Sequence, residues 1–203
     1  MALFDSIKNQ VTSQLKREAS KIVNNASQNA SQAIAKGRNR TESFTFSSLP
    51  TSVEELKSLP EASLDSAFKT AALCIAVLCN LEKDANATWE MLDYLKGPED
   101  VNEREKAFII ERLAGKQYKT FSFFKGATPD NGYAPATPYT ITVSENPYSF
   151  DEENWATLYV TSGGADHPRP IKLRRKPSTN QWFVNEIQCL ADIRIPTSQD
   201  EWA

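Results

Sequence analysis

Apolar residues in the part of the chain that follows position 40 recur at the spacing of helices. Ser52 followed by Glu55 has the pattern of a capping box and predicts a short helix that ends before Pro60. A second helix is predicted to begin at Ser63 or Asp65. Its apolar residues cover almost every side, so we expect it to be the central helix of the core. These residues are Phe68, Ala71, Ala72, Leu73, Ile75, Ala76, Val77, Leu78 and Leu81.

Two further helices are predicted between this central helix and position 115. The first ends at Gly97, and the second begins at a capping box formed by Asn102 and Glu105 and ends at Gly115. Apolar residues mark both helices, namely Trp89, Met91, Leu92, Leu95, Ala107, Phe108, Ile110 and Leu113.

The second half of the chain contains four segments that alternate or are rich in β-branched and aromatic residues, which is typical of β-strands. These segments are 139–144, 156–162, 170–176 and 181–187, and a further alternating segment, 41–46, is a candidate short strand. Connections as short as those between the four segments join antiparallel neighbours. The sequence therefore predicts an α+β fold, in which a helical N-terminal half packs on an antiparallel β-meander of about four strands.

A basic amphipathic helical arm, residues 1–40, is predicted to precede a single α+β domain, residues 41–203. The arm carries seven basic and two acidic groups, a net charge of +5, which leaves −8 for the rest of a chain whose total is −3. Apolar residues in the arm repeat every eleven positions, as Phe4, Leu15 and Ala26 do. Such a repeat has about 3.67 residues per turn and keeps one face of a helix apolar.

Three interpretations of the arm are open. The first is a partly disordered tail, or a helix that packs on its own domain or on a second copy of the chain. The second is a helix on an anionic membrane surface, with Phe4, Ile7, Val11 and Leu15 in the interface. The third, nucleic-acid binding, is least favoured, because the arm has one aromatic residue and the domain is acidic. We therefore expect a protein partner or self-association through this helix, or peripheral contact with an anionic membrane.

Several classes of function are excluded by what the sequence lacks. The longest apolar run, Ala71 to Cys79, has nine residues, whereas a membrane-spanning helix needs roughly 20. The N-terminus lacks the apolar segment of a secretory signal, so we expect a cytoplasmic protein whose three cysteines are reduced and inert. Nucleotide-binding glycine motifs and zinc-protease motifs are absent, and His167 is the only histidine. We therefore expect no cofactor and no metal site, and we assign no catalytic residue.

The most informative segment is the long connection 116–138, which is rich in aromatic residues around an Asp-Asn-Gly turn. Structureless loops of this length are uncommon in compact domains and tend to be functional. In a meander this connection lies at the same end of the sheet as the glycine-rich loop 162–169, so the two loops are predicted to form one rim. The candidate binding residues of the rim are Phe123, Phe124, Asn131, Tyr133, Gly163, Gly164, Asp166, His167 and Arg169.

Two interpretations of the rim compete. In the first, the paired glycines allow a ligand to approach the backbone, and their N–H groups together with Arg169 bind a carboxylate or phosphate. In the second, the glycines form a turn above aromatic residues that cap the core. His167 beside Asp166 is the only place where a nucleophile–base arrangement could start, but a single histidine in a loop is usually solvated.

One predicted strand carries a basic face. Lys172, Arg174 and Lys176 recur at every second position, so their side chains are expected on one side of the sheet, opposite Ile171 and Leu173. This face could receive an anionic ligand. Alternatively it is solvated and faces acidic residues such as those of segment 151–153.

Several blocks of the sequence carry a resemblance: LPTSVEELKSLPEASLDSAFKTAAL, YLKGP, GATPDNGYAPATPYTITVSENPYS, ATLYVTSGGADHPRPIKLRRK and QWF. Together they resemble an uncharacterised bacterial family seen mostly in Firmicutes. The resemblance covers roughly residues 47–203 and excludes the arm. It implies a cytosolic bacterial protein of unassigned activity, and it carries no functional residue over to this chain.

We expect the domain to be a non-enzymatic binding or scaffolding module of the bacterial cytosol, with an N-terminal helix that mediates association. The alternative is a small carboxylate-dependent enzyme that uses Asp130 and Asp166 at the rim formed by loops 116–138 and 162–169. An enzyme should have a concave, partly apolar pocket between these loops, whereas a binding module should have a flat or filled rim.

Overall fold

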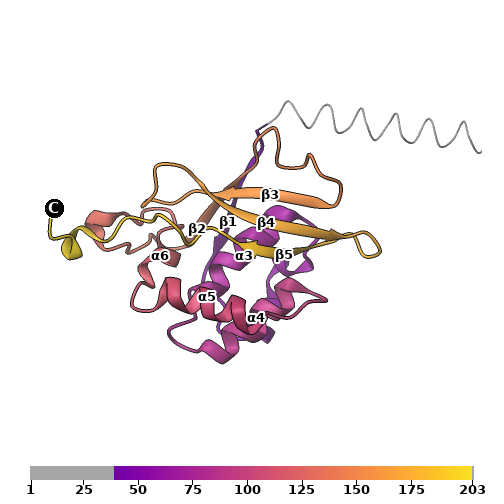
Figure 1. Ribbon diagram of the computed structural model, residues 1–203, viewed down its shortest axis with the longest axis horizontal. Coiled ribbons are helices and arrows are strands. Elements are labelled where there is room, and N and C mark those ends of the chain that lie inside the picture. Colours follow the sequence, from indigo (N-terminus) through magenta and orange to yellow (C-terminus); the bar gives the residue numbers. More distant parts are fainter. Residues whose placement is uncertain (1–38, 203) are drawn as a thin grey trace, which may run out of the picture. The chain divides into compact units, whose positions relative to one another are not determined.

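The computed structural model describes residues 39–202, which form an antiparallel sheet with helices packed against one of its faces (Figure 1). Nearly all of the predicted arm, residues 1–38, lies outside the described residues, as does residue 203. The α+β fold class is confirmed. No helix between residues 39 and 202 is long and apolar enough to cross a membrane.

The sheet has five strands in the order β1-β2-β3-β4-β5, and each strand is antiparallel to its neighbours. The predicted meander is confirmed as β2 to β5, and the candidate strand at 41–46 is β1, which pairs with β2 at the edge of the sheet. The strands are β1 (Thr41–Phe46), β2 (Tyr139–Ser144), β3 (Trp155–Val160), β4 (Arg169–Lys176) and β5 (Gln181–Ile187).

The four helices predicted after residue 40 are present. The central one begins after its N-cap Ser66 and not at Ser63 or Asp65, because Ser63 belongs to a separate 3-10 turn. The α-helices are α2 (Val53–Ser58), α3 (Ala67–Leu78), α4 (Ala85–Lys96), α5 (Glu103–Leu113) and α6 (Tyr118–Phe121), and the 3-10 turns are η1 (Pro60–Ser63), η2 (Pro129–Asn131) and η3 (Thr197–Gln199). The capping box of Asn102 and Glu105 is formed at the start of α5. The segment 116–138 differs from the long structureless loop that we expected, because it contains α6 and η2.

The core lies between α3 and the inner face of the sheet. Every residue of α3 except Lys69 is buried, as expected of the central helix. The alternate apolar residues of the strands cover it from the other side, among them Ile141, Leu158 and Leu173, which are fully buried. Among the described elements, α3 packs against all five strands and α4 against β5, and both lie on this one face (Figure 1). The opposite face of the sheet carries the polar and aromatic residues that alternate with the core positions.

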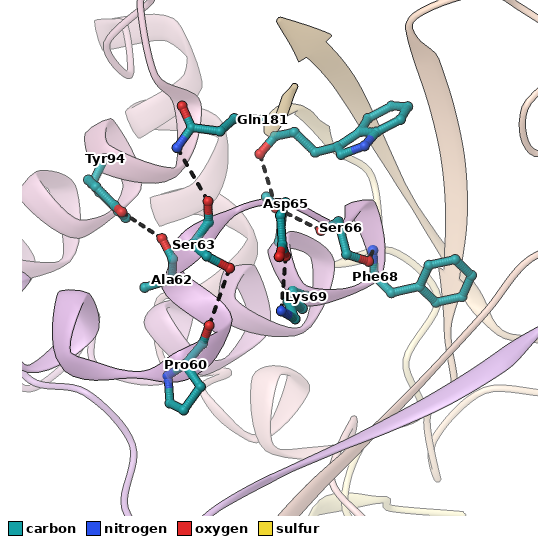
Figure 2. Close-up of polar contacts among 11 residues, drawn as sticks. Pro60, Ala62, Ser63, Asp65, Ser66, Phe68, Lys69, Tyr94 and Gln181 are labelled. Carbon is teal, nitrogen blue, oxygen red and sulfur yellow. Dashed lines mark hydrogen bonds and ion pairs between the residues drawn. The ribbon is translucent and has the colours of Figure 1, made fainter. Parts of the chain in front are cut away.

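The segment that leads into α3 forms hydrogen bonds with the first residues of β5, along the edge of this strand that pairs with no other strand of the described chain. Trp182 donates its backbone N–H to the carbonyl of Leu64 at 2.8 Å, and Thr70 donates its hydroxyl to the carbonyl of Trp182 at 3.0 Å. Gln181 donates its side-chain amide to the carbonyl of Ser63 at 3.3 Å (Figure 2). The backbone N–H and carbonyl of Trp182 are therefore paired, although they lie on an edge where another strand could otherwise bond to them.

Candidate functional site

The two loops of the predicted rim contact each other at one end of the sheet. The backbone N–H of Gly163 donates to the carbonyl of Ser122 at 2.8 Å. The buried hydroxyls of Ser122 and Ser162 are 2.8 Å apart, and the hydroxyl of Ser162 also accepts the N–H of Gly164 at 3.1 Å. Both glycine N–H groups are therefore used within the protein and do not form the anion-binding concavity that the sequence suggested.

The paired glycines serve close packing between the two loops. A Cβ atom on Gly163 would overlap the carbonyl oxygen of Ala127, and one on Gly164 would overlap the hydroxyl of Tyr133. Only a residue without a side chain allows the backbone to approach this closely at either position.

The aromatic residues of the rim fill the space beneath the loops. Phe123, Phe124 and Tyr133 are buried, and the ring of Tyr133 stacks on that of Tyr118 with centroids 5.5 Å apart. The Tyr133 hydroxyl donates to the carbonyl of Arg194 at 2.6 Å, and burial raises the pKa of this phenol. This geometry matches the interpretation in which aromatic residues cap the core.

The polar residues of the rim differ in what they contact. The side chain of Asn131 accepts the N–H of Thr128 at 2.9 Å and donates to the carbonyl of Gly126 at 2.8 Å, so it holds the shape of its own loop. Asp166 is exposed and pairs with Arg194 at 3.0 Å. His167 is exposed on the same loop.

Arg169 faces the C-terminal segment that follows β5. Its guanidinium donates to the carbonyl of Asp192 at 2.6 Å and lies 3.7 Å from the carboxylate of the same residue. The segment around Asp192 and Arg194 therefore belongs to this end of the sheet, a contribution that the sequence reasoning missed. A binding role for the nine rim residues stays a prediction.

A cleft of about 270 Å³ lies at a different place, between the C-terminal end of α4 and the hairpin that joins β4 to β5. Lys96, Pro98 and Glu99 line it on the side of α4, and residues 174–177 and 183–185 line it on the side of the hairpin. We call it the hairpin cleft. Its volume is close to the lower end of the roughly 300–1,000 Å³ that small-molecule sites occupy.

A β-bulge shapes one wall of the hairpin cleft. Leu173 pairs with Val184 and the adjacent Lys172 pairs with Glu186, so Asn185 is the extra residue on β5. Its carbonyl accepts a bond from the Nζ of Lys96 at 3.4 Å. The bulge therefore presents to α4 a backbone group that a regular ladder would hold within the sheet.

Positive charge predominates in the hairpin cleft. Its lining contains Lys96, Arg174, Arg175 and Lys176 but a single carboxylate, Glu99. The side chain of Lys96 is only 9% exposed, and it forms an ion pair with Glu105 at 2.6 Å. Arg175 donates to Asn180 at 2.7 Å, while its buried Nε has no hydrogen-bond partner.

Arg174 has an aromatic cross-strand partner on each of its two neighbouring strands. It is the cross-strand partner of Trp155 on β3 and of Phe183 on β5, so the three side chains share the open face of the sheet. Its guanidinium carbon is 5.2 Å from the centre of the Trp155 ring. Its Nη1 lies 3.9 Å from Glu99, and this ion pair is weak because both side chains are exposed.

The three cysteines offer no reactive thiolate near either site. Burial raises the pKa of both Cys74 and Cys79 to about 12, and it also raises the pKa of Cys189. All three thiols are therefore protonated at neutral pH, which agrees with the expectation that they are inert.

Sequence reasoning found only part of the hairpin cleft. The sequence predicts that the basic strand with Arg174 and Lys176 could receive an anion, but it does not indicate Lys96, Phe183 or the bulge at Asn185. These residues come from a helix and a strand that are distant in the sequence. The signal available was the alternation of charge along β4, which places the cations without showing what lies opposite them.

A family model described as a domain of unknown function (DUF6935) matches residues 48–197 of the chain. This range runs from α2 to β5 and includes both the rim and the hairpin cleft. The resemblance to an uncharacterised family is therefore confirmed. No curated protein and no solved structure matches the chain.

Proposed function

The chain belongs to the DUF6935 family, whose function is unknown, and from the geometry of its own residues we propose that it is a non-enzymatic binding module. Its ligand is a small anion held in the hairpin cleft. The proposal includes the bacterial cytosolic setting and the association through the N-terminal helix that the sequence led us to expect.

The observation that carries the proposal is the concentration of cations in one cavity of an acidic domain. The lining of the cleft has four basic side chains and one acidic side chain, whereas residues 41–203 together have 16 basic and 24 acidic residues, a net charge of −8. A partly enclosed cavity lined by one sign of charge raises the local concentration of ligands of the opposite sign.

The chemistry of the lining supports binding without a reaction. The lining residues have no hydroxyl, thiol or imidazole group. The one carboxylate, Glu99, is exposed, and the buried ammonium of Lys96 is paired with Glu105. The groups that remain, above all Arg174 and Lys176, are suited to holding an anion through charge-assisted hydrogen bonds.

The alternative of a carboxylate-dependent enzyme at the rim is not favoured by the geometry. Asp130 accepts a bond from Thr197 at 2.8 Å, and Asp166 pairs with Arg194. Both carboxylates are exposed, and the aromatic residues between the two loops are buried.

Calorimetric titration of the full chain with inorganic pyrophosphate tests the proposal. We expect binding at low ionic strength that weakens as salt is added. Arg174→Ala should weaken it about tenfold, because a hydrogen bond to a charged group is lost. Glu99→Gln should strengthen it, because the carboxylate that competes for Arg174 is removed.

Lys172→Ala is the matched control. Lys172 lies two positions before Arg174 on the same strand and face and also stacks on Trp155, at 4.8 Å, but it does not line the cleft. It should change the affinity much less than Arg174→Ala does. The proposal is overturned if the unmodified chain does not bind pyrophosphate, or if the two alanine variants weaken binding equally.

A further inference from the structure

The hairpin cleft has two chemically different walls. Arg174 and Lys176 supply positive charge from the end of β4, while Phe183, Pro98 and Pro177 supply apolar surface. A bare inorganic anion would meet the cations and leave the apolar wall in contact with water. A ligand that combines an anionic group with a flat apolar group would cover both walls, which is the usual composition of small-molecule sites.

The ring of Phe183 is fixed at the wall of the cleft. It lies against the backbone of Gly97, where a Cβ atom would overlap it. Gly97 follows the last residue of α4 with φ of +74°, a conformation that favours glycine. A ring held in this way is a preorganised surface on which a planar group can stack.

The charged group and the ring belong to residues that lie opposite each other on neighbouring strands. Arg174 and Phe183 are direct cross-strand partners, so their Cβ atoms are separated by about 4.5–5.5 Å. A ligand that stacks on the ring therefore has its anionic group within reach of the guanidinium only if the two parts are joined by a short linker. A sugar between a base and a phosphate is such a linker.

Asn185 adds a group that can read the edge of a planar ring. The bulge places this residue in the lining of the cleft, and a side-chain amide both donates and accepts hydrogen bonds. Its backbone carbonyl accepts a bond from Lys96, which is itself paired with Glu105. The main chain that carries the amide is therefore fixed in position.

We infer that the hairpin cleft binds a nucleoside phosphate, with the base against Phe183 and Asn185 and the phosphate groups at Arg174 and Lys176. The inference rests on the proposed function, because it specifies the anion that the same cleft takes. A volume of about 270 Å³ has room for one nucleotide unit, so the ligand that we infer is a free nucleotide, and binding of a nucleic-acid strand is one outcome of the test.

The test compares ligands on the unmodified full chain, by calorimetry and in the absence of divalent cations. The probes are ADP, GDP, CDP and UDP, with inorganic pyrophosphate as the ligand without a base and adenosine as a ligand without phosphate. At least one nucleoside diphosphate should bind about tenfold more tightly than pyrophosphate, the gain expected from stacking on one ring. Adenosine alone should bind more weakly than ADP.

Two variants assign the parts of the ligand to the two walls. Phe183→Leu should remove the advantage of the nucleoside diphosphate and leave the affinity for pyrophosphate unchanged. Arg174→Ala should weaken both ligands by a similar factor, and Lys172→Ala is again the control. If Phe183→Leu does not fold, as judged by circular dichroism, Asn185→Ala and the ligand series on the unmodified chain still decide the question.

The outcomes separate this inference from the proposed function. If pyrophosphate binds as tightly as every nucleoside diphosphate, the inference of a nucleotide ligand is overturned, and the proposed anion-binding function is kept. If neither pyrophosphate nor any nucleotide binds, both fall. If a single-stranded oligonucleotide binds more tightly than every mononucleotide, the inference of a free nucleotide is overturned, and the cleft is part of a surface that binds nucleic acid.

Discussion

The ring of Phe183 occupies the space that a side chain at Gly97 would need. A Cβ atom at Gly97 would overlap three carbons of the ring, Cγ, Cδ1 and Cε1. The contact joins the C-terminal end of α4 to the last strand of the sheet, and it fixes the distance between the two sides of the hairpin cleft. The cleft therefore depends on a glycine that does not line it.

Gly97→Ala should destabilise the domain and reshape the cleft. Two costs add: the left-handed backbone disfavours a side chain by about 1–2 kcal/mol, and overpacking against the ring adds about 1–3 kcal/mol. Gly115→Ala is the control, because Gly115 has φ of +64° and nothing within 4 Å of its added Cβ. Urea denaturation of both variants measures the difference, and equal losses would show that the ring yields without cost.

Gly163→Ala tests whether the rim is a packed junction. The added Cβ would overlap a backbone atom, the carbonyl oxygen of Ala127, which cannot rotate away. We expect a loss of about 3 kcal/mol in the free energy of unfolding. Gly132→Ala lies in the same rim with φ of +63° and open space, so it should lose only about 1 kcal/mol. A smaller loss at Gly163 than at Gly132 would mean that the two loops separate easily.

Local patterns were enough to predict most of the fold. The four strands of the meander and the capping box at Asn102 each depend on a few neighbouring residues, and α3 is recognisable because its apolar residues cover all sides. The meeting of the two rim loops followed from antiparallel connectivity alone. The same rule puts the end of β5 at this end of the sheet, since Ile187 pairs with Ile171 near the start of β4. The C-terminal segment that carries Asp192 could therefore have been included.

The hairpin cleft could not be predicted in the same way. It exists because Lys96 meets a bulged carbonyl at Asn185, and because Gly97 accepts the ring of Phe183. A bulge adds one residue to a strand. The sequence of segment 181–187 has the pattern of an ordinary strand whether or not a bulge is present. Contacts of this kind depend on tertiary packing between two elements. The periodicity within one element gives no information about that packing.

Substitution of α3 should reveal the centre of the core. Leu73 and Leu78 are both fully buried, so Leu73→Ala and Leu78→Ala should each lower the free energy of unfolding by about 2–5 kcal/mol. Ile110→Ala on α5 is the control, since Ile110 is 48% exposed and should lose about 0.5 kcal/mol or less. Thermal or urea denaturation measures all three. A loss below about 1 kcal/mol at both leucines would place the core elsewhere.

Lys119 should make stability depend on pH in the alkaline range. This lysine is buried with its Nζ 3.3 Å from the carbonyl of Leu190, and desolvation, assisted by Lys116 and Arg112, lowers its pKa. Its unfolded pKa is higher, so the unfolded state binds more protons between the two values and stability rises with pH there. The penalty of the buried charge is fully present below the folded pKa.

Lys119→Met removes this charge while keeping a long apolar side chain. The variant should be more stable than the unmodified chain at neutral pH, and its advantage should shrink as pH rises toward the ordinary pKa of lysine. Urea denaturation at a series of pH values gives the difference. A difference that stays constant with pH would show that the effect of the substitution is packing rather than charge.

Removal of residues 1–38 should leave the domain folded and reduce its association. The cut keeps Arg40, whose guanidinium lies 4.2 Å from the centre of the Phe68 ring and whose N–H donates to Glu145 at 3.2 Å. Residues 40–203 form one compact unit, so circular dichroism and the unfolding midpoint should change little. Sedimentation of the full and shortened chains should show fewer copies per particle for the shortened one, after the smaller mass of its chain is taken into account.

The apolar repeat of the arm, and not its charge alone, should carry this association. Val11→Ser with Leu15→Ser in the full chain interrupts the repeat and keeps all seven basic residues of the arm. If the apolar face holds two copies together, this variant sediments like the shortened chain, because burying apolar surface is the main driving force of association. Flotation with anionic liposomes separates the membrane alternative, in which the unmodified chain floats and the variant does not. Identical behaviour of all three proteins in both assays would reduce the arm to a passive tail.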